Sequence, residues 1–342
     1  MSRLKLLTNF ALILALCASC CKQEAEALPL PDNPCEDDKI EVTFSIDGGV
    51  AMEYQTKTTT LPPEDVINNY QILVYNSNGK LDGYGQSSSS GNISVRLTRG
   101  SGKKCYAVVN TTAELDLLTD EDLLLDWRSE LPVYTTGGFE MLGMVEKDLT
   151  SATSCQIPVK RFVSKVTIDK ISTNFSNMPV YDEFGLKIKR IFLTNVRTDC
   201  PFTFNQTATA TDGWINKMGF EYTMHNVIGD DEINKYATYS TPHYFYCMPN
   251  PTTTDVQGGT SFSPRYTRLV VETSLAGSTY YYPINIVGSD GMLNPNTSYE
   301  ITNLTITGLG SDNPDIIPQK GSVSFSVKVT DWANGFSKTV EY

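Results

Sequence analysis

Cysteine and histidine side chains are the groups in this sequence best suited to metal or redox chemistry. The 342-residue chain contains eight cysteines and only two histidines, His225 and His243. His243 precedes Cys247 by four residues, but the stretch HYFYC is typical of an aromatic strand, where residues four apart do not converge as they do on a helix. No CxxC pair occurs after residue 20, so the spacing of zinc or thioredoxin-like sites is missing. We therefore expect no metal site and no redox centre.

Other patterns that carry catalytic or cofactor chemistry are also missing. The sequence has no GxSxG or HExxH pattern that would place a nucleophile or a zinc ion. GSGKK, residues 100–104, lacks the first glycine and the final Ser or Thr of a phosphate-binding loop, and a turn between two strands explains it better. The acidic stretches 230–232 and 312–315 lack EF-hand spacing and are interpreted as solvated loops. We predict that the protein is not an enzyme and binds no cofactor.

Three cysteines lie close together near the N-terminus, at positions 17, 20 and 21. They follow a basic start and an apolar run, 10–16, that is too short to cross a bilayer as a helix, which needs roughly 20 apolar residues. A basic start, a brief apolar core and small residues at its end indicate a secretory signal. The cluster is therefore assigned to export rather than to metal binding.

Cys20 is the residue that we expect to be modified. Ala18 and Ser19 directly before it resemble the lipobox of bacterial lipoproteins, in which the signal is cut and the new N-terminal cysteine is acylated, for example with palmitate. The match departs from the usual pattern because Cys17, rather than leucine, stands three places before Cys20. We predict a signal peptide over residues 1–19 and a lipid on Cys20. An ordinary secretory signal cut near the same point is the alternative.

Composition narrows the class of protein further. A formal net charge of -12 argues against nucleic-acid binding, which rewards clustered Lys and Arg. A charged fraction of 19% together with 18 tyrosines suits an extracellular β-rich protein. Cys105 and Cys155 fall in predicted strands of the first half, and Cys200 and Cys247 in the second. One disulfide per half and buried free thiols are both compatible with this distribution.

Period-two alternation predicts strands along most of the chain. Residues 20–38 are polar, acidic and proline-bearing, and we expect a tether there. The strand that follows places Ile40, Val42, Phe44 and Ile46 on one face. Only 112–131 is typical of a helix in the first half, with Thr119 and Asp122 resembling a capping box. Further strands are predicted within 69–85, 92–110, 138–147, 154–171, 184–196, 244–249, 266–287, 298–310 and 321–332.

Many short strands, turn signals between them and few helices indicate antiparallel β-sandwiches. The roughly 320 residues after the signal exceed the usual length of a single domain. We therefore predict an all-β fold class with minor helices and two tandem antiparallel β-sandwich domains, covering 39–160 and 161–342.

Several of these segments, taken in order, resemble one protein family. INNYQILVYNSNGKL, YAVVN, FEMLGMV and IPVKRFVSKVTIDKI follow the order seen in the first domain of the fimbrillins of Bacteroidales, which are type V pilins. LNPNTSYEITNLTITGLGSDNPD and SVSFSVKVTDW resemble that family's closing segment. The resemblance implies two transthyretin-like β-sandwich domains and a role as the structural subunit of an adhesive fimbria.

The resemblance also implies a mechanism of assembly. In the family, a lipoprotein precursor reaches the outer membrane, and a protease of trypsin-like specificity, usually for Arg, cuts a loop after the first strand. The strand that is lost here would carry Ile40, Val42, Phe44 and Ile46. The strand donated by the next subunit would carry Phe336, Val340 and Tyr342. This is donor-strand exchange, a form of β-strand addition.

One position departs from the family pattern. No Arg lies between Arg3 and Arg96, so Lys57 is the best substitute for the cut site. If Lys57 is only an exposed lysine, the chain remains anchored through the lipid on Cys20.

The expected partners are copies of this chain or other pilins, outer-membrane lipid through Cys20, and a host or bacterial surface ligand. The expected location is the outer membrane and then the extracellular fimbria. The alternative is a lipid-anchored, glycan-binding surface lipoprotein that does not polymerise, with Trp214 and the tyrosines of 278–284 as its candidate binding residues.

Overall fold

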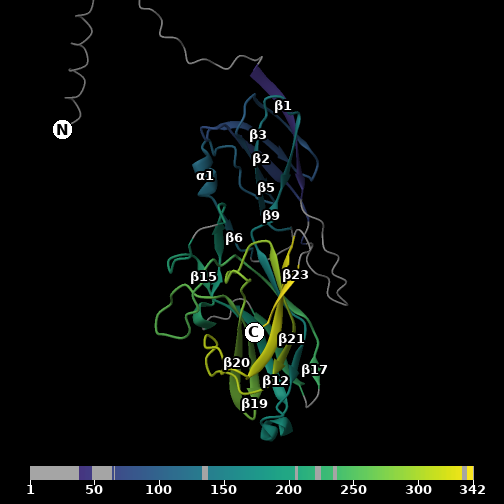
Figure 1. Cartoon of the computed structure of the whole chain (residues 1–342), viewed down its shortest axis with the longest axis vertical. Coiled ribbons are helices and arrows are strands. Elements are labelled where there is room, and N and C mark those ends of the chain that lie inside the picture. The colour runs from purple at the N-terminus through teal and green to yellow at the C-terminus, as the bar shows by residue number, and fades with distance from the viewer. Residues whose placement is uncertain are drawn as a thin grey trace, which may run out of the picture. The chain divides into compact units, whose positions relative to one another are not determined.

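The computed structural model describes residues 38–47, 64, 66–132, 138–204, 207–219, 225–233, 237–332 and 337–341. Residues 39–342 form one compact unit, distinct from residues 1–38. Strands make up nearly all of the regular structure of this unit, which confirms the all-β fold class (Figure 1). No helix in the described ranges is long and apolar enough to cross a membrane.

Two sheets build the first half of the unit. The smaller sheet contains β1 (Lys39–Asp47), β4 (Ile93–Thr98) and β8 (Ser154–Pro158). The larger contains β2 (Tyr70–Tyr75), β3 (Leu81–Ser87), β5 (Lys103–Val109), β7 (Met141–Lys147) and β9 (Lys160–Arg161). Their strand orders are β4-β1-β8 and β3-β2-β5-β7-β9. The strand predicted first in the chain therefore lies in the middle of its sheet.

The apolar faces of these two sheets form the first core. Period-two alternation explains its composition, since β4 buries Ile93, Val95 and Leu97 and exposes the residues between them. Glycines at 83 and 85 allow β3 to approach β4 closely, because a Cβ at Gly85 would lie 2.6 Å from Ile93 Cγ2. The buried members of this core are Val42, Phe44, Tyr70, Ile72, Val74, Ile93, Val95, Leu97, Cys105, Ala107, Val109, Met141, Leu149, Cys155, Ile157 and Val159.

Two larger sheets build the second half. One contains β10 (Ser164–Ile168), β11 (Ile171–Thr173), β17 (Thr238–Tyr239), β18 (His243–Cys247), β21 (Thr297–Ile306), β22 (Val323–Asp331) and β23 (Ser337–Glu341). The other contains β12 (Leu186–Thr194), β16 (His225–Ile233), β19 (Arg268–Leu275) and β20 (Ser278–Asn285). The first has the order β17-β11-β21-β10-β18, with β22 pairing with β21 and with β23. The second has the order β16-β12-β19-β20.

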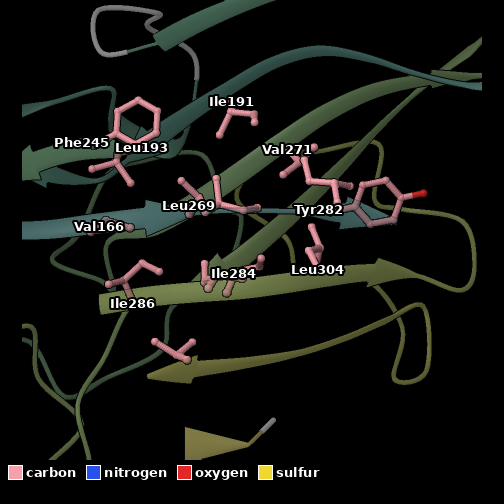
Figure 2. Packing of buried hydrophobic residues seen from close by; sticks show 14 of the residues in the cluster. Val166, Ile191, Leu193, Phe245, Leu269, Val271, Tyr282, Ile284, Ile286 and Leu304 are labelled. Atoms are coloured by element: carbon pink, nitrogen blue, oxygen red, sulfur yellow. The ribbon is translucent and has the colours of Figure 1, made fainter. Parts of the chain in front are cut away.

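The second core lies between these sheets. Figure 2 shows Val166 and Phe245 from one sheet facing Ile191, Leu193 and Leu269 from the other. Each of these five side chains is less than 7% exposed. Burial of a side chain of this size is worth about 1.5–3 kcal/mol, so this core is a major source of stability for the second half.

Short elements and a third apolar cluster join the two halves of the unit. The short elements are α1 (Glu121–Leu125), β6 (Arg128–Glu130), β13 (Val196–Arg197), β14 (Asp199–Pro201), β15 (Trp214–Ile215) and two 3-10 turns, η2 (Pro179–Glu183) and η3 (Lys217–Gly219). β6 from the first half pairs with β14 from the second. The third cluster likewise draws on both halves, with Leu73, Tyr106 and Phe139 packing near Phe162 and Trp332.

The helix predicted over 112–131 is wrong except for α1, a single short turn. Asp120, not Thr119, precedes the helix, and no side chain caps it. Tertiary hydrogen bonds explain the difference. Gln71 Nε2 donates to the Ala113 carbonyl at 2.6 Å, and the Tyr75 hydroxyl donates to the Leu118 carbonyl at 2.9 Å. These bonds hold the backbone against the larger first-half sheet, so its polar groups are satisfied without a helix.

Two predictions about the strands also need correction. The alternation favours one long strand around residues 155–170, but β8, β9, β10 and β11 divide this stretch between sheets of both halves. Pro158, which lacks a backbone N–H, ends β8. Most pairs are antiparallel as predicted, but β1–β8, β10–β21 and β11–β21 are parallel. Parallel neighbours require crossover connections, which short turn signals in the sequence do not show.

Candidate functional site

The position of β1 is the first element of the candidate site. The backbone of residues 39–44 pairs antiparallel with β4, and that of residues 43–47 pairs parallel with β8. Two further backbone bonds extend the contact with the β8 side, from Thr43 N to Thr153 O at 2.9 Å and from Val159 N to Asp47 O at 3.0 Å. β1 therefore fills the whole space between two strands that do not pair with each other.

The side chains of β1 close the first core from the same position. Val42 and Phe44 are fully buried, and Ile40 and Ile46 are partly buried against the same cluster. At about 1.5–3 kcal/mol for each of the two fully buried side chains and about half of that for each of the two partly buried ones, β1 contributes on the order of 5–9 kcal/mol before the cost of ordering it. Without β1, the sheet would present a groove with an apolar floor and two unpaired backbone edges, which is a template for another strand.

Glu64 is the second element of the site, and it lies in the segment that follows β1. Lys165 Nζ donates to its carboxylate at 2.7 Å, and the Tyr246 hydroxyl donates to the same carboxylate. Arg161 Nε donates to the Glu64 carbonyl oxygen at 3.2 Å. The side chains of Lys165 and Glu64 are only 4% and 11% exposed, so the ion pair is largely shielded from water.

Aromatic rings surround this ion pair. The Arg161 guanidinium lies 4.7 Å from the centre of the Trp332 ring, which is within cation–π range. The Tyr246 ring stacks on Trp332 with centroids 6.1 Å apart. Burial and the neighbouring Glu64 carboxylate raise the pKa of Tyr246, which keeps its hydroxyl protonated as a donor. We call Glu64, Arg161, Lys165, Tyr246 and Trp332 the Glu64 latch.

The C-terminal strand β23 is the third element. In the described part of its sheet it pairs only with β22, in an antiparallel register that sets Val340 opposite Val327. A strand at the edge of a sheet is held by one ladder of backbone hydrogen bonds rather than two. β23 begins opposite Thr330 of β22, two residues before Trp332 of the Glu64 latch in the chain.

A pair of carboxylates on the same sheet gives a pH-dependent prediction. Burial and the neighbouring Glu300 carboxylate raise the pKa of Asp169 from its ordinary value of 3.8 to about 6. The stability contributed by protonated Asp169 is therefore present below about pH 4 and is lost as the pH rises through about 6. Asp169→Asn is expected to raise the free energy of unfolding by about 1 kcal/mol at pH 7.5 and to have little effect at pH 4.

Urea unfolding of the wild type and of Asp169→Asn at both pH values measures this difference. The exposed Asp116→Asn serves as the control and should behave like the wild type at each pH. An equal effect of Asp169→Asn at both pH values would contradict the assignment to this carboxyl group.

A comparison with known protein families identifies the fold and the class of the chain. Residues 39–217 match the family model of the major fimbrial subunit protein, FimA. The chain belongs to the FimA family. Members of this family are structural subunits of fimbriae, so the chain is a cell-surface structural protein and not an enzyme. No curated protein sequence matches the chain.

Solved structures support the same fold for this FimA-family chain. A fimbrilin from Porphyromonas gingivalis has 15% sequence identity and a TM-score of 0.62, with 86% of this chain and 97% of that chain covered. A candidate cell adhesion protein from Bacteroides eggerthii has 19% identity and a TM-score of 0.63, with 86% and 96% covered. The tip fimbrial protein Mfa3 from Porphyromonas gingivalis has 14% identity and a TM-score of 0.52, with 89% and 100% covered.

The structure of the FimA-family chain places some of the predicted site residues and leaves others outside the described ranges. Ile40, Val42, Phe44 and Ile46 all lie on β1 and face the first core as the alternation predicted. Val340 lies on β23, in a different sheet of the same chain. The residues that fall outside the described ranges are Cys20, Lys57, Phe336 and Tyr342.

The Glu64 latch is not among the features that the sequence predicts. Lys165 lies within a predicted apolar strand, where a lysine needs a partner for its buried charge. Its position is therefore the one sequence feature that indicates a buried ion pair. Its partner could not be found by spacing, because Glu64 is 101 residues away in the chain.

The histidine and cysteine of β18 do not form a metal site in the described structure. The His243 ring stacks on Tyr239, whose hydroxyl lies 2.7 Å from His243 Nε2, and burial lowers the pKa of His243. The Cys247 thiol instead donates to the Ser164 carbonyl at 3.9 Å. Among the described residues, no group of three or more His, Cys, Asp or Glu side chains could hold a metal ion.

The structure also bears on two other groups of residues that the sequence singled out. Trp214 is buried and donates through Nε1 to the Thr209 carbonyl at 2.8 Å, and Tyr282 is buried with its hydroxyl on the Gly308 carbonyl. These two residues therefore serve packing, whereas Tyr280 and Tyr281 of the same segment are only half-buried. Asp315 does not lie in a solvated loop, since it is fully buried between the guanidinium groups of Arg265 and Arg268, each 2.5 Å away.

Proposed function

We propose that this chain is a fimbrial subunit that polymerises by donor-strand exchange and serves adhesion. Loss of β1 opens the groove between β4 and β8, and the C-terminal strand of the next subunit fills it. The observation that supports this best is the central place of β1, which pairs with a different neighbour on each side while Val42 and Phe44 complete the first core. Replacement of such a strand by one from another chain restores both ladders and the core.

Delivery to the outer membrane is part of the proposal. The secretory signal over 1–19 and the lipobox-like Ala18-Ser19 before Cys20 support export and acylation there. The segment 20–38 would then separate the lipid from β1. The proposed domains are 39–160 and 161–342, and the separation of the first and second cores on either side of this boundary supports them.

Lys57 is the proposed cut site. It lies after the end of β1 at Asp47 and before Glu64, so a cut there would separate the whole first strand from the rest of the protein. Thr58 would become the new N-terminus, and the Glu64 latch would still hold the chain six residues further along. Removal of residues 20–57 also removes the lipidated Cys20, which would release the subunit from the membrane into the fibre.

The donor strand is the proposed partner of the groove. Positions 336, 338, 340 and 342 alternate onto one face of an extended strand and supply Phe, Lys, Val and Tyr. Three of the four residues are apolar and can replace the apolar face of β1, while Lys338 would have to extend its ammonium out of the groove. The edge position of β23, with one described neighbour, supports its release from its own sheet.

The decisive experiment treats the purified precursor with a limiting amount of trypsin-like protease. We expect a new N-terminus at Thr58 and multimers that resist SDS, because strand-exchanged subunits dissociate slowly. Lys57→Ala should remain uncut at this position and monomeric. A clean cut at Lys57 that yields no multimers would reject donor-strand exchange.

A matched pair of variants tests the donor. Val340→Asp places a carboxylate on the face that enters the groove, whereas Thr339→Asp places it on the opposite face. We expect multimers to disappear for Val340→Asp and for deletion of 336–342, and to persist for Thr339→Asp. Equal yields of multimers from all three would assign the donor to another segment.

A further inference from the structure

Two cysteine side chains meet inside the first core. Cys105 lies on β5 and Cys155 on β8, so they come from the two facing sheets. Their exposed fractions are 0% and 3%. In the structure both are free thiols, they belong to the same buried cluster, and each shifts the pKa of the other, as neighbouring groups do. A single cross-link between them would join the two sheets.

The two strands that carry the thiols lie close together. Stacked sheets usually lie about 10 Å apart, which is too far for a disulfide between strands that need Cα atoms within about 7 Å. Some Cα atoms of β5 and β8 approach within 8 Å of one another, which is less than the usual spacing of stacked sheets. The alternation of each strand then directs Cys105 and Cys155 to the same side, into the core.

The other two cysteines of the described chain are arranged differently. Cys200 belongs to the third apolar cluster and its thiol donates to the Pro201 carbonyl at 3.5 Å. Cys247 belongs to the second core and donates to Ser164. Each has a backbone carbonyl as partner and lies in a separate cluster. Of the one-per-half pairings that the sequence allows, the structure favours only the one in the first half.

We propose that Cys105 and Cys155 form a disulfide bond in the exported protein. The thiolate of one attacks the disulfide of a thiol–disulfide exchange partner, such as an oxidoreductase of the cell envelope, and forms a mixed disulfide. The second thiolate of this chain then attacks the chain's own sulfur in the mixed disulfide. The Cys105–Cys155 bond forms, and the partner leaves as a dithiol. The chain loses two protons and two electrons, and the partner gains them.

The timing of this step follows from the packing of the core. The neighbouring Cys155 and burial raise the pKa of the Cys105 thiol in the folded chain, whereas the neighbouring Cys105 lowers the pKa of the Cys155 thiol, so access rather than thiolate content decides when the bond can form. Neither sulfur is open to an exchange partner once the core has closed. Oxidation therefore precedes the final packing of β8 against β5.

The bond has a consequence that rests on the proposed function. Cys155 lies opposite Phe44 in the register of β8 with β1, so the cross-link would sit directly beside the groove. It would tie β8 to the facing sheet without involving β1. When β1 leaves, β8 would stay in place as one wall of the groove, ready for the incoming strand.

Peptide mapping of the full-length exported precursor tests the proposal. The protein is denatured with N-ethylmaleimide present and without reductant, digested with trypsin and examined by mass spectrometry. We expect peptide 105–128 joined to peptide 148–160, and separation of the two after reduction. Alkylation of both Cys105 and Cys155 in the unreduced sample, or a bond from either to another cysteine, would overturn the proposal.

Thermal unfolding provides a second readout that does not depend on the map. Reduction should lower the Tm of the wild type by roughly 5–15 °C, because the bond closes a long loop of the unfolded chain. The control Cys200→Ala should retain this shift, whereas the double variant Cys105→Ala/Cys155→Ala should lose it. A shift that persists in the double variant would overturn the proposal.

Both measurements use the uncut precursor, so they are independent of polymerisation. If the disulfide is mapped in a precursor that forms no multimers, the disulfide proposal stands and strand exchange is rejected. If a precursor with both thiols alkylated forms multimers, strand exchange stands and the disulfide proposal is rejected.

Discussion

Phe44→Ala is expected to lower the free energy of unfolding of the uncut precursor by ~3–5 kcal/mol, yet to leave the stability of the assembled polymer unchanged. The Phe44 side chain is fully buried in the first core of the precursor, so its truncation opens a cavity there. In the proposed polymer, β1 has been removed and the groove holds the donor strand instead. Urea unfolding of the precursor and melting of SDS-resistant multimers measure the two effects.

Glu41→Ala is the matched control, because Glu41 is exposed on the other face of the same strand. It should change neither quantity by more than about 0.5 kcal/mol. If Phe44→Ala does not fold, Val42→Ala offers a smaller truncation at a fully buried position of β1. Polymers made from either core variant that melt earlier than the wild type would mean that β1 stays in the fibre, against the proposal.

Lys165→Met is expected to destabilise the protein by about 3 kcal/mol, since it leaves the shielded Glu64 carboxylate without its ammonium partner. Methionine keeps most of the length and volume of the lysine side chain, so packing changes little. The loss should appear as a lower urea midpoint with an unchanged slope.

The double variant Glu64→Gln/Lys165→Met separates the ion pair from other contacts of Lys165. It removes both charges, and we expect it to recover at least half of the loss caused by Lys165→Met alone. Each single variant and the double variant together form a double-mutant cycle. Strictly additive effects would show that the coupling free energy between Glu64 and Lys165 is zero. The ion pair of the Glu64 latch would then contribute nothing to stability.

The fold was largely predictable from local sequence because strand alternation is a local property. β1 and β4 each have a buried and a less buried face that can be read from every second residue. Local sequence was misleading over 112–131, where Thr119 and Asp122, resembling a capping box, predicted a helix. There, bonds from Gln71 and Tyr75 on a distant strand decide the backbone, and no local pattern shows them.

The candidate site was predictable only in part, for the same physical reason. The apolar face of β1 is local and was found. Its place between β4 and β8 depends on pairing with residues up to about 110 positions away, and a parallel pair leaves no turn signal in the sequence. The Glu64 latch and the Cys105–Cys155 pair are likewise long-range contacts. Residue type indicated that these groups needed partners, but only the fold shows which partners they have.

The central place of β1 separates two events, the cut in the peptide chain and the departure of the strand. Cutting the peptide chain after Lys57 breaks none of the backbone hydrogen bonds of β1 to β4 or β8, and it exposes neither Val42 nor Phe44. A nicked subunit would therefore remain closed, with its own severed strand still in place. An incoming strand would have to enter at one end of the groove and displace the resident strand residue by residue. The nicked subunit would thus persist as a stable monomer. Displacement of β1 by a neighbouring subunit, and not proteolysis, would limit the rate of fibre growth.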